Sequence, residues 1–364
     1  MERRSGALEN LVINAAFWRG RRVFVTGHTG FMGGWLVLTL RGLGAEVHGY
    51  ALDPPTTPNL FGTAGVGGAL KTDVRGDVRD LDRLSTALQD AKPDTVLHLA
   101  AQPLVLESYR TPVETYTVNV LGTVHLLEAM RRAACVAAAV IVTSDKCYKN
   151  DGSGHAFRED DPLGGADPYS NSKACAELVT AAYRDSFFAP AAGSAIATAR
   201  AGNIIGGGDW GANRLIPDCV RAFGANTPVV LRHPRAIRPW QHVLDAVLGY
   251  LLLIEKMCGA DGGRYAAGWN FGPDAKDTVP VEDVATHLMN ALGGKVVVEE
   301  HGDALHEAAV LQLDNSRALK DLGWVQKWPI RQALDETAAW YAAWTAGGDM
   351  TAFTRAQIDR YVAA

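Results

Sequence analysis

The side chains best suited to chemistry form two groups near the middle of the chain. In the first, an apolar run ends in Ser144, Asp145 and Lys146. In the second, beyond a loop rich in glycine, aspartate and proline, Tyr169 and Lys173 stand at the head of a helical pattern. A hydroxyl, a carboxyl group, a phenol and two amines are thus placed between an expected strand end and an expected helix start. This combination predicts an active site for proton and hydride transfer.

Tyr169 and Lys173 are one helical turn apart, so both side chains project from the same face of the helix. A phenol is a weak base at neutral pH because its ordinary pKa is near ~10. A neighbouring ammonium group stabilises the phenolate and lowers that pKa. We therefore expect Tyr169 to take the proton of a substrate hydroxyl while hydride leaves the same carbon. We expect Ser144 to hydrogen-bond the same hydroxyl.

A glycine-rich turn near the start of the chain is expected to bind a dinucleotide. Residues 21–26 form a short apolar run, typical of a strand buried on both faces of a parallel sheet, and a turn with Gly27, Gly30 and Gly33 follows. An apolar helical segment and a second short strand at 46–50 complete the opening βαβ unit of a dinucleotide-binding fold. We expect Gly27 to allow the tight turn, Gly30 to let a pyrophosphate approach the backbone, and Gly33 to permit close helix packing.

Further strand and helix patterns extend this unit. Buried strands are expected at 94–101 and 195–201, and amphipathic helices at 111–132 and 169–188. His98, inside the first of these strands, is expected to be a core histidine with its hydrogen bonds satisfied rather than a catalyst. The alternation predicts an α/β fold with a doubly wound parallel sheet of the Rossmann type.

The strict alternation of strand and helix fades after residue 201. We therefore predict a dinucleotide-binding domain at 1–201 and a smaller C-terminal α/β domain at 202–364 that binds the substrate. Some segments of the second domain are expected to return to the first. A chain of 364 residues suits one large domain or two joined domains.

Composition excludes several classes of function. Apolar residues make up 48% of the chain and charged residues 21%, as in ordinary globular proteins. A net charge of −5 gives no electrostatic reason to expect nucleic acid as a partner. The apolar stretches are too short to span a membrane, and we see no signal peptide. The five cysteines include no Cys-x-x-Cys pair, which predicts a reduced, cytoplasmic compartment and no metal site.

The motifs together resemble a known family. The spacing G-x-x-G-x-x-G, with Y-x-x-x-K further on, resembles the extended short-chain dehydrogenase/reductase superfamily. The stretches FWRGRRVFVTGHTGF, YALDPPTTPNLF, TSDKCY and RPWQHV resemble the nucleotide-sugar 4,6-dehydratases that act on CDP-glucose. The resemblance runs roughly from Phe17 to Trp344. Dehydratases of this superfamily place Asp and Glu after the active-site Ser or Thr, and here Lys146 replaces the Glu.

The resemblance implies NAD as the cofactor and a set of residues that hold it. That set is Gly27, Thr29, Gly30, Phe31, Met32, Gly33, Asp53, Asp77, Val78, Leu99, Ala100, Ala101, Asn119, Tyr169 and Lys173. Asp53 lies slightly beyond the usual position for the ribose, which Ala51 occupies, and an acid there favours NAD over NADP. No Arg cluster follows that strand, which points the same way. Asp77 and Val78 are expected at the adenine edge, although Asp77 could instead cap a helix at 80–90. Asn119 is expected to support the catalytic lysine through a water molecule, or else to face solvent.

The substrate implied is CDP-D-glucose, with the cytidine base resting on the resemblance alone. Candidate substrate-binding residues are Ser108, Tyr109, Asn203, Arg214, Leu215 and Arg238. Four arginines, Arg214, Arg232, Arg235 and Arg238, stand together in an otherwise acidic chain. An arginine donates hydrogen bonds in pairs, so it suits a diphosphate.

The pair Asp145 and Lys146 distinguishes a dehydratase from an epimerase or a reductase. A dehydratase needs an acid and a base beyond Tyr169. We expect Lys146, if neutral, to remove the C-5 proton and Asp145, if protonated, to protonate the departing C-6 hydroxyl. The two could instead form a salt bridge at a strand end. A 4-epimerase or a reductase would share the other residues without needing this pair. A silent NAD-sensing protein would not need Tyr169 and Lys173.

The helices at 111–132 and 169–188 also resemble the pair that forms a four-helix dimer interface in this superfamily. A homodimer is therefore expected. The apolar positions of the two helices could equally belong to the ordinary core.

Overall fold

The computed structural model describes residues 13–188, 193–231, 233–299 and 310–363. Its centre is a parallel sheet of seven strands in the order β11-β7-β5-β4-β1-β2-β3. The strands are β1 (Arg22–Thr26), β2 (Glu46–Ala51), β3 (Thr72–Arg75), β4 (Thr95–His98), β5 (Ala138–Val142), β7 (Ala195–Ala201) and β11 (Gly268–Phe271). This order is that of the doubly wound dinucleotide-binding fold. The predicted fold class is confirmed.

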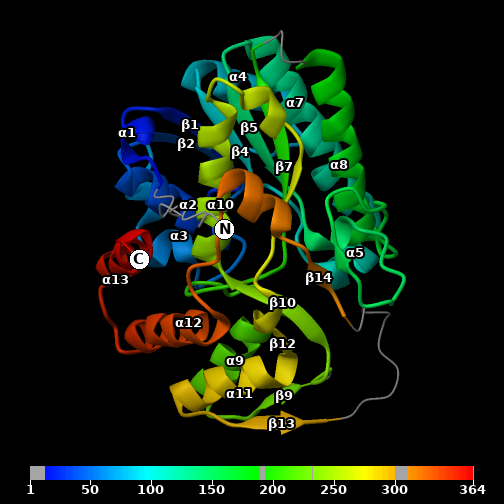
Figure 1. The fold of residues 1–364 in the computed structure, drawn as a ribbon. Coiled ribbons are helices and arrows are strands. Elements are labelled where there is room, and N and C mark those ends of the chain that lie inside the picture. Colours follow the sequence, from blue (N-terminus) through cyan, green and yellow to red (C-terminus); the bar gives the residue numbers. More distant parts are fainter. Residues whose placement is uncertain (1–12, 189–192, 232, 300–309, 364) are drawn as a thin grey trace, which may run out of the picture.

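Helices cover both faces of the sheet, and successive side chains of each strand point to opposite faces. Both sets of side chains are therefore buried. In β1, Val23 and Val25 join the larger core, whereas Phe24 joins a second core across the sheet. Helices α2 (Phe31–Gly42) and α10 (Val243–Met257) pack over the first face (Figure 1). Helices α4 (Leu81–Ala91), α7 (Gly122–Ala133) and α8 (Pro168–Phe187) pack over the second (Figure 1).

The other helices connect these layers or belong to the smaller part of the molecule. They are α1 (Ala15–Trp18), α3 (Leu60–Thr63), α5 (Val105–Arg110), α6 (Pro112–Tyr116), α9 (Leu215–Gly224), α11 (Val281–Leu292), α12 (Ile330–Thr345) and α13 (Met350–Ala363). The helix expected at 111–132 consists of α6 and α7 joined by a π-helical turn, Thr117–Leu121. The helix expected at 169–188 is α8.

Three small sheets lie outside the main one. Strands β12 (Thr278–Pro280), β10 (Ile237–His242) and β8 (Asn203–Ile205) form one sheet, β13 (Val296–Val298) and β9 (Val229–Leu231) a second, and β14 (Gln312–Leu313) and β6 (Ala156–Phe157) a third. Figure 1 shows β9, β10, β12 and β13 with helices α9 and α11 below the main sheet. They form the smaller α/β part that the sequence predicted.

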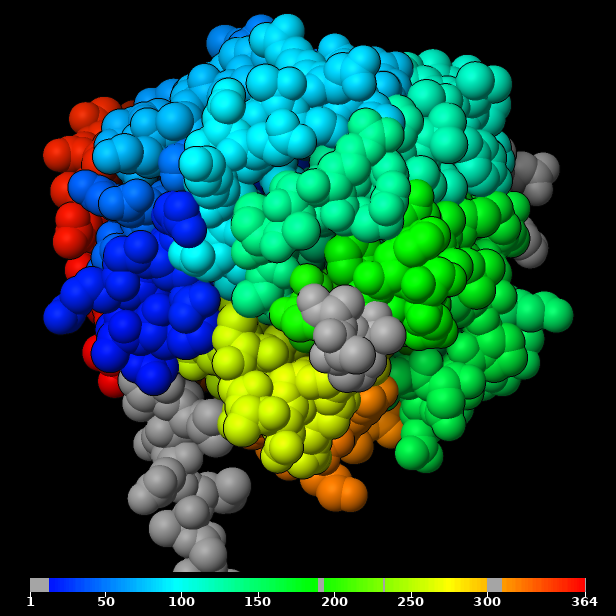
Figure 2. All heavy atoms as spheres, turned by 90° about the horizontal axis from the view of Figure 1, so that it is seen from above, coloured from blue at the N-terminus to red at the C-terminus, as the bar shows by residue number. Residues whose placement is uncertain are grey.

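Parts of the chain beyond residue 201 return to the main sheet. Strand β11 pairs with β7, and α10 packs against β5 and β7. The boundary at 201/202 stays a prediction. Figure 2, which looks down on the molecule of Figure 1, shows blue, cyan, green and yellow segments packed side by side at this end. No helix among the described residues is long and apolar enough to cross a membrane.

Candidate active site

The turn after β1 is shaped by its glycines. Gly27 has a φ of +75°, which favours glycine. A Cβ on Gly27 would lie 2.7 Å from Ala100 N, and one on Gly33 would lie 2.1 Å from Gly27 O. Helix α2 begins after Gly30 without a side-chain cap, so the N–H groups of its first turn remain available to an anion. The turn therefore fits the diphosphate of a dinucleotide. Phe31 is the first residue of helix α2.

The ends of β2 and β3 lie beside this turn. Thr29 Oγ1 donates a hydrogen bond to Leu52 O at 2.9 Å, just past the end of β2. The side chain of Asp53 is 87% exposed, and its carboxylate pairs with Arg75 Nε at 3.5 Å. The tertiary structure thus brings an arginine from β3 to the carboxylate that is expected to meet the ribose. The sequence argument concerned an Arg cluster after β2, and this single arginine comes from the neighbouring strand.

Asp77 and Val78 follow β3, and their polar groups have partners within the chain. The Asp77 carboxylate is bound by the guanidinium of Arg79, which lowers the pKa of Asp77. The cap of α4 is Asp80, whose side chain accepts from Arg83 N, so Asp77 does not cap this helix. The Val78 carbonyl accepts a hydrogen bond from His125 Nδ1 at 3.0 Å.

The turn after β4 contains Leu99, Ala100 and Ala101. The backbone N–H groups of Leu99 and Ala100 each donate to Thr26 Oγ1 at 3.2 Å, which ties this turn to the end of β1. His98 is 2% exposed, and its ring nitrogens contact Thr26 Oγ1 at 2.7 Å and Thr123 Oγ1 at 3.3 Å. Burial lowers the pKa of His98 to about 3. The prediction of a satisfied core histidine is confirmed.

Asn119 lies in the π-helical turn between α6 and α7 and is 2% exposed. Its side-chain oxygen accepts from Gln102 N at 2.8 Å, and its amide donates to Ser172 Oγ at 2.9 Å. Asn119 therefore faces the protein interior rather than solvent. It joins the turn after β4 to the helix that carries Lys173.

Helix α8 begins at Pro168, next to the helix start that the sequence predicts at Tyr169. Asp167 caps it by accepting from Ser170 N at 2.9 Å, and a proline with a fixed φ opens the first turn. Ser108 is fully buried, accepts from Tyr169 N at 3.1 Å and donates to Val105 O at 2.7 Å. The sequence suggested Ser108 as a substrate ligand. Its hydroxyl is instead committed to the backbone at the start of α8.

The protonation states of Tyr169 and Lys173 are governed by burial. Burial raises the pKa of Tyr169 to about 12, although a hydrogen bond with Ser144 and the charge of Arg214 act the other way. This is the opposite of the lowered pKa that the sequence predicted. Burial lowers the pKa of Lys173 to about 8, with Glu177 acting against the shift. Lys173 Nζ donates to Val142 O at 3.1 Å and so lies at the end of β5.

Ser144 and Asp145 lie two and three residues beyond the end of β5 and are both buried. Ser144 Oγ donates to Asp145 Oδ1 at 3.0 Å and accepts from Lys146 N at 3.2 Å, which holds residues 145–147 in a 3₁₀ turn. Burial raises the pKa of Asp145 in spite of the nearby charges of Lys146 and Arg238. Among the described residues, Asp145 Oδ2 has no hydrogen-bond partner. Burial thus favours the protonated carboxyl group that dehydration requires.

Asp145 and Lys146 do not form the alternative salt bridge. No N–O distance within 4.0 Å links these two side chains among the ion pairs of the described residues. Lys146 is only partly buried, next to the fully enclosed Asp145. The two side chains therefore occupy different environments despite their adjacency.

The candidate substrate residues come from several elements. Arg214, just before α9, pairs with Asp209 at 3.0 Å, and its charge acts on the Tyr169 phenol. Arg238 on β10 is 3% exposed, and its charge acts on Asp145. Asn203 begins β8, Leu215 begins α9, and Tyr109 on α5 is 40% exposed. Arg232 lies outside the described residues.

Comparison with known proteins identifies the family. The model of the family described as GDP-mannose 4,6 dehydratase matches residues 24–337. The chain is 45% identical to the CDP-glucose 4,6-dehydratase of Salmonella typhimurium, in an alignment that covers 97% of this chain and 99% of that protein. The chain belongs to the GDP-mannose 4,6 dehydratase family. The predicted membership among nucleotide-sugar dehydratases is confirmed.

More distant members of this dehydratase family and its relatives share the fold. The dTDP-glucose 4,6-dehydratase of Streptomyces venezuelae, solved with NAD bound, is 25% identical, with a TM-score of 0.76 over 90% of this chain and 99% of that one. A UDP-glucose 4-epimerase of Mycolicibacterium smegmatis is 27% identical over 88% of this chain and 98% of its own length. The scaffold thus serves more than one reaction, so the fold alone does not determine which one this chain performs.

A buried ion pair near the dehydratase site was missed by the sequence reasoning. Glu177 on α8 and Arg200 on β7 lie 2.8 Å apart, with side chains only 3% and 5% exposed. Two signals could have revealed them. Glu177 is one helical turn beyond Lys173, and Arg200 is the one charged residue in the apolar stretch AIATARA.

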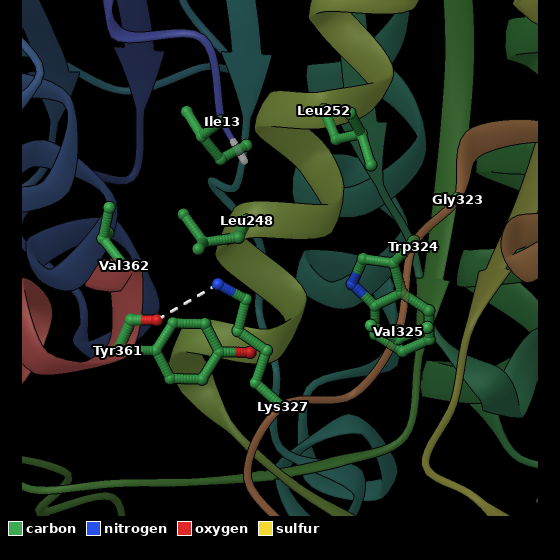
Figure 3. Close-up of a pocket in the computed structure, with 9 residues that line it drawn as sticks. All are labelled: Ile13, Leu248, Leu252, Gly323, Trp324, Val325, Lys327, Tyr361 and Val362. Carbon is green, nitrogen blue, oxygen red and sulfur yellow. Dashed lines mark hydrogen bonds between the residues drawn. The ribbon is translucent and has the colours of Figure 1, made fainter. Parts of the chain in front are cut away.

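A small pocket elsewhere does not belong to this site. It has a volume of about 30 Å³. In Figure 3 it lies between Leu248 and Leu252 of α10 and Tyr361 of α13, where Lys327 Nζ donates to Tyr361 O at 3.3 Å. It is too small for a nucleotide sugar.

Proposed function

We propose that this protein is an NAD-dependent dehydratase that converts CDP-D-glucose to CDP-4-keto-6-deoxy-D-glucose and water. The observation that carries this proposal is the placement of Asp145. Its carboxyl group is buried, has a raised pKa, and follows Ser144 at the carboxyl end of a central strand. Reduction or epimerisation at C-4 does not need such an acid.

NAD is the cofactor that the turn after β1 would hold. Gly27, Gly30 and Gly33 leave the backbone open to a diphosphate, and Asp53 is the acid that would bind the ribose. When bound, NAD supplies the acceptor for hydride from C-4 of the sugar and later the donor of hydride to C-6.

Tyr169 takes the proton of the C-4 hydroxyl in the oxidation step. Its pKa of about 12 makes the phenol a weak base by itself. The positive charges of Arg214 and Lys173 favour the phenolate, and the Ser144 hydroxyl holds the substrate oxygen. The ketone that results acidifies the proton on C-5.

Lys146 and Asp145 then remove water. Lys146 accepts the C-5 proton, and Asp145 protonates the C-6 hydroxyl as it leaves. Lys146 afterwards returns its proton to C-5. The proton that Tyr169 gained replaces the one that Asp145 gave up, so the whole cycle releases only water.

The assignment of cytidine as the substrate's base rests on similarity to the Salmonella enzyme, which is named a CDP-glucose 4,6-dehydratase. Arg214 and Arg238 are the described cations placed to bind a diphosphate. The charge of Arg214 acts on Tyr169 and that of Arg238 acts on Asp145, so a diphosphate bound by both arginines would orient the sugar toward these two groups.

The test is turnover of CDP-, dTDP-, UDP- and GDP-glucose, followed by the alkaline absorbance of a 4-keto sugar. We expect a 4-keto product from CDP-glucose and much slower turnover of the others. Formation of CDP-galactose without a 4-keto product would instead establish a 4-epimerase. Equal turnover of all four substrates would contradict the assignment of the base.

We also propose a homodimer that uses α6, α7 and α8 of each subunit. Helix α8 packs against α6 and α7, and apolar side chains on these segments remain exposed. Val113 is 79% exposed, Leu121 47% and Leu178 59%. Apolar groups gathered on neighbouring helices are typical of an interface between subunits.

A cytoplasmic location is proposed because all five cysteines are free thiols.

A further inference from the structure

The buried ion pair between Glu177 and Arg200 belongs to a larger polar network. Glu177 accepts hydrogen bonds from the hydroxyl of Thr143 and, at 2.6 Å, from that of Thr198. The same carboxylate accepts from Arg200 Nη2 at 2.8 Å. Arg200 Nη1 donates in turn to the hydroxyl of Tyr148 at 2.7 Å. A buried charged pair is costly to maintain unless it is hydrogen-bonded. This pair has several partners, and of the arginine's nitrogens only Nε has none among the described residues.

The network forms hydrogen bonds with both ends of one short segment, Thr143–Tyr148. Thr143 is the residue before Ser144, and Tyr148 closes the 3₁₀ turn of residues 145–147. Both are buried, with exposures of 6% and 2%. The Tyr148 hydroxyl also donates to Asn270 Oδ1 at 2.7 Å, on strand β11. Between these two anchors lie the acid and the base of the dehydration step.

We propose that Glu177 and Arg200 are positioning residues that fix the segment Thr143–Tyr148, and thereby hold Asp145 and Lys146 for the elimination of water. The inference rests on the proposed function. Among the described hydrogen bonds, Glu177 and Arg200 reach neither Tyr169 nor the glycine turn. The charge of Glu177 acts on Lys173, so the uncharged Tyr148 separates elimination from oxidation more cleanly. Misplacing an acid or base by about 1 Å lowers a rate by roughly 100-fold.

The first test is Tyr148→Phe. This change removes one hydroxyl and leaves the ring stacked on Phe157, whose centroid lies 4.9 Å away. We expect kcat for CDP-glucose to fall roughly tenfold or more with KM within about twofold. Bound NADH should accumulate after mixing with substrate, because oxidation continues while elimination slows.

A second readout does not depend on activity. The N–H groups of Thr143, Lys146 and Cys147 are hydrogen-bonded to Ala199 O, Ser144 Oγ and Ser144 O. Hydrogen–deuterium exchange of residues 143–148 should be faster in Tyr148→Phe than in the unaltered protein. The matched control is Tyr361→Phe on α13, which also removes a buried hydroxyl with a side-chain partner, Asp245 on α10. This control should leave both the exchange of 143–148 and kcat unchanged.

Glu177→Gln tests the ion pair itself and should give a larger fall in kcat and faster exchange of residues 143–148. Its NADH level does not separate the two steps, because the charge of Glu177 also acts on Lys173. If it does not fold, Tyr148→Phe still decides the matter. Unchanged kcat and unchanged exchange in folded Tyr148→Phe would overturn the proposal, and so would parallel loss of kcat and of NADH formation. If the unaltered protein does not dehydrate CDP-glucose, the proposed function fails instead, while the exchange result still reports on the network.

Discussion

Asp145 shows how burial sets the chemistry of a single residue. Its carboxyl group is 2% exposed and its pKa is raised, so it keeps a proton that an exposed aspartate would lose. Lys146 beside it is partly exposed. Two neighbours in the sequence thus lie in different environments, one fully buried and one partly exposed.

Asp145→Asn should abolish dehydration and stabilise the folded protein. In the unfolded chain the group titrates near its ordinary value of 3.8, whereas the folded state retains the proton to higher pH. The folded state therefore binds more protons above pH 3.8, and this group's contribution to stability falls as the pH rises. The free energy of unfolding of Asp145→Asn should exceed that of the unaltered protein by an amount that grows from acid to neutral pH and reaches about 1–3 kcal/mol.

The free energy of unfolding, measured by urea titration at several pH values, checks this expectation. Asp359→Asn, at an exposed position on α13, is the control and should show little change. An advantage of Asp145→Asn that is independent of pH would contradict a raised pKa.

Lys146→Gln should block elimination while leaving oxidation possible. Turnover of CDP-glucose should fall at least roughly 100-fold because the C-5 proton has no base. Bound NADH, followed by its near-ultraviolet absorbance, should accumulate. Lys149→Gln, at an exposed position three residues further on, should behave like the unaltered protein. Normal turnover in Lys146→Gln would remove this lysine from the mechanism.

At the scale of elements, tight contacts decide where the cofactor and the catalytic helix can lie. The turn after β1 contacts the turn after β4, with no room for a Cβ on Gly27. The π-helical turn at Thr117–Leu121 places Asn119 against Ser172 of α8. These contacts connect the cofactor side of the site to the helix of Tyr169.

Gly33→Ala should damage both stability and NAD binding. Its Cβ would lie 2.1 Å from Gly27 O, so the turn or the helix must shift. We expect a loss of about 1–3 kcal/mol in the free energy of unfolding and weaker NAD binding in calorimetry. Gly42→Ala in the same helix meets no atom within 4 Å and should be neutral or slightly stabilising. Equal effects of the two changes would contradict the role given to Gly33.

At the scale of the whole molecule, the main sheet collects strands from distant parts of the chain. Strand β11, formed by Gly268–Phe271, adds to a sheet whose other strands end at residue 201. Asn270 on this strand reaches Tyr148, so the late strand also supports the active-site segment. A strand from the C-terminal part of the chain therefore supports the segment that follows β5.

Leu178→Glu should weaken the proposed dimer. A carboxylate in an apolar interface is costly to bury, so the dissociation constant should rise at least about tenfold. Analytical ultracentrifugation measures this change. Leu319→Glu is the control, because Leu319 is 48% exposed and lies outside α6, α7 and α8. A monomer in the unaltered protein, or an unaffected dimer in Leu178→Glu, would exclude this interface.

The sequence by itself determined the features that depend on local spacing. The glycine turn, the helical spacing of Tyr169 and Lys173, and the order Ser144-Asp145 each follow from a few adjacent residues. Apolar runs and helical periods were enough to predict the Rossmann fold, because strands buried on both faces require such runs.

Only the tertiary structure decided which distant charges meet and which groups keep their protons. Arg75 reaches Asp53 from another strand, and Arg200 reaches Glu177 across the layer between β7 and α8. The raised pKa of Tyr169 comes from burial, which is the combined effect of many elements. Desolvation and charge act through space, so no local pattern in the sequence could have supplied them.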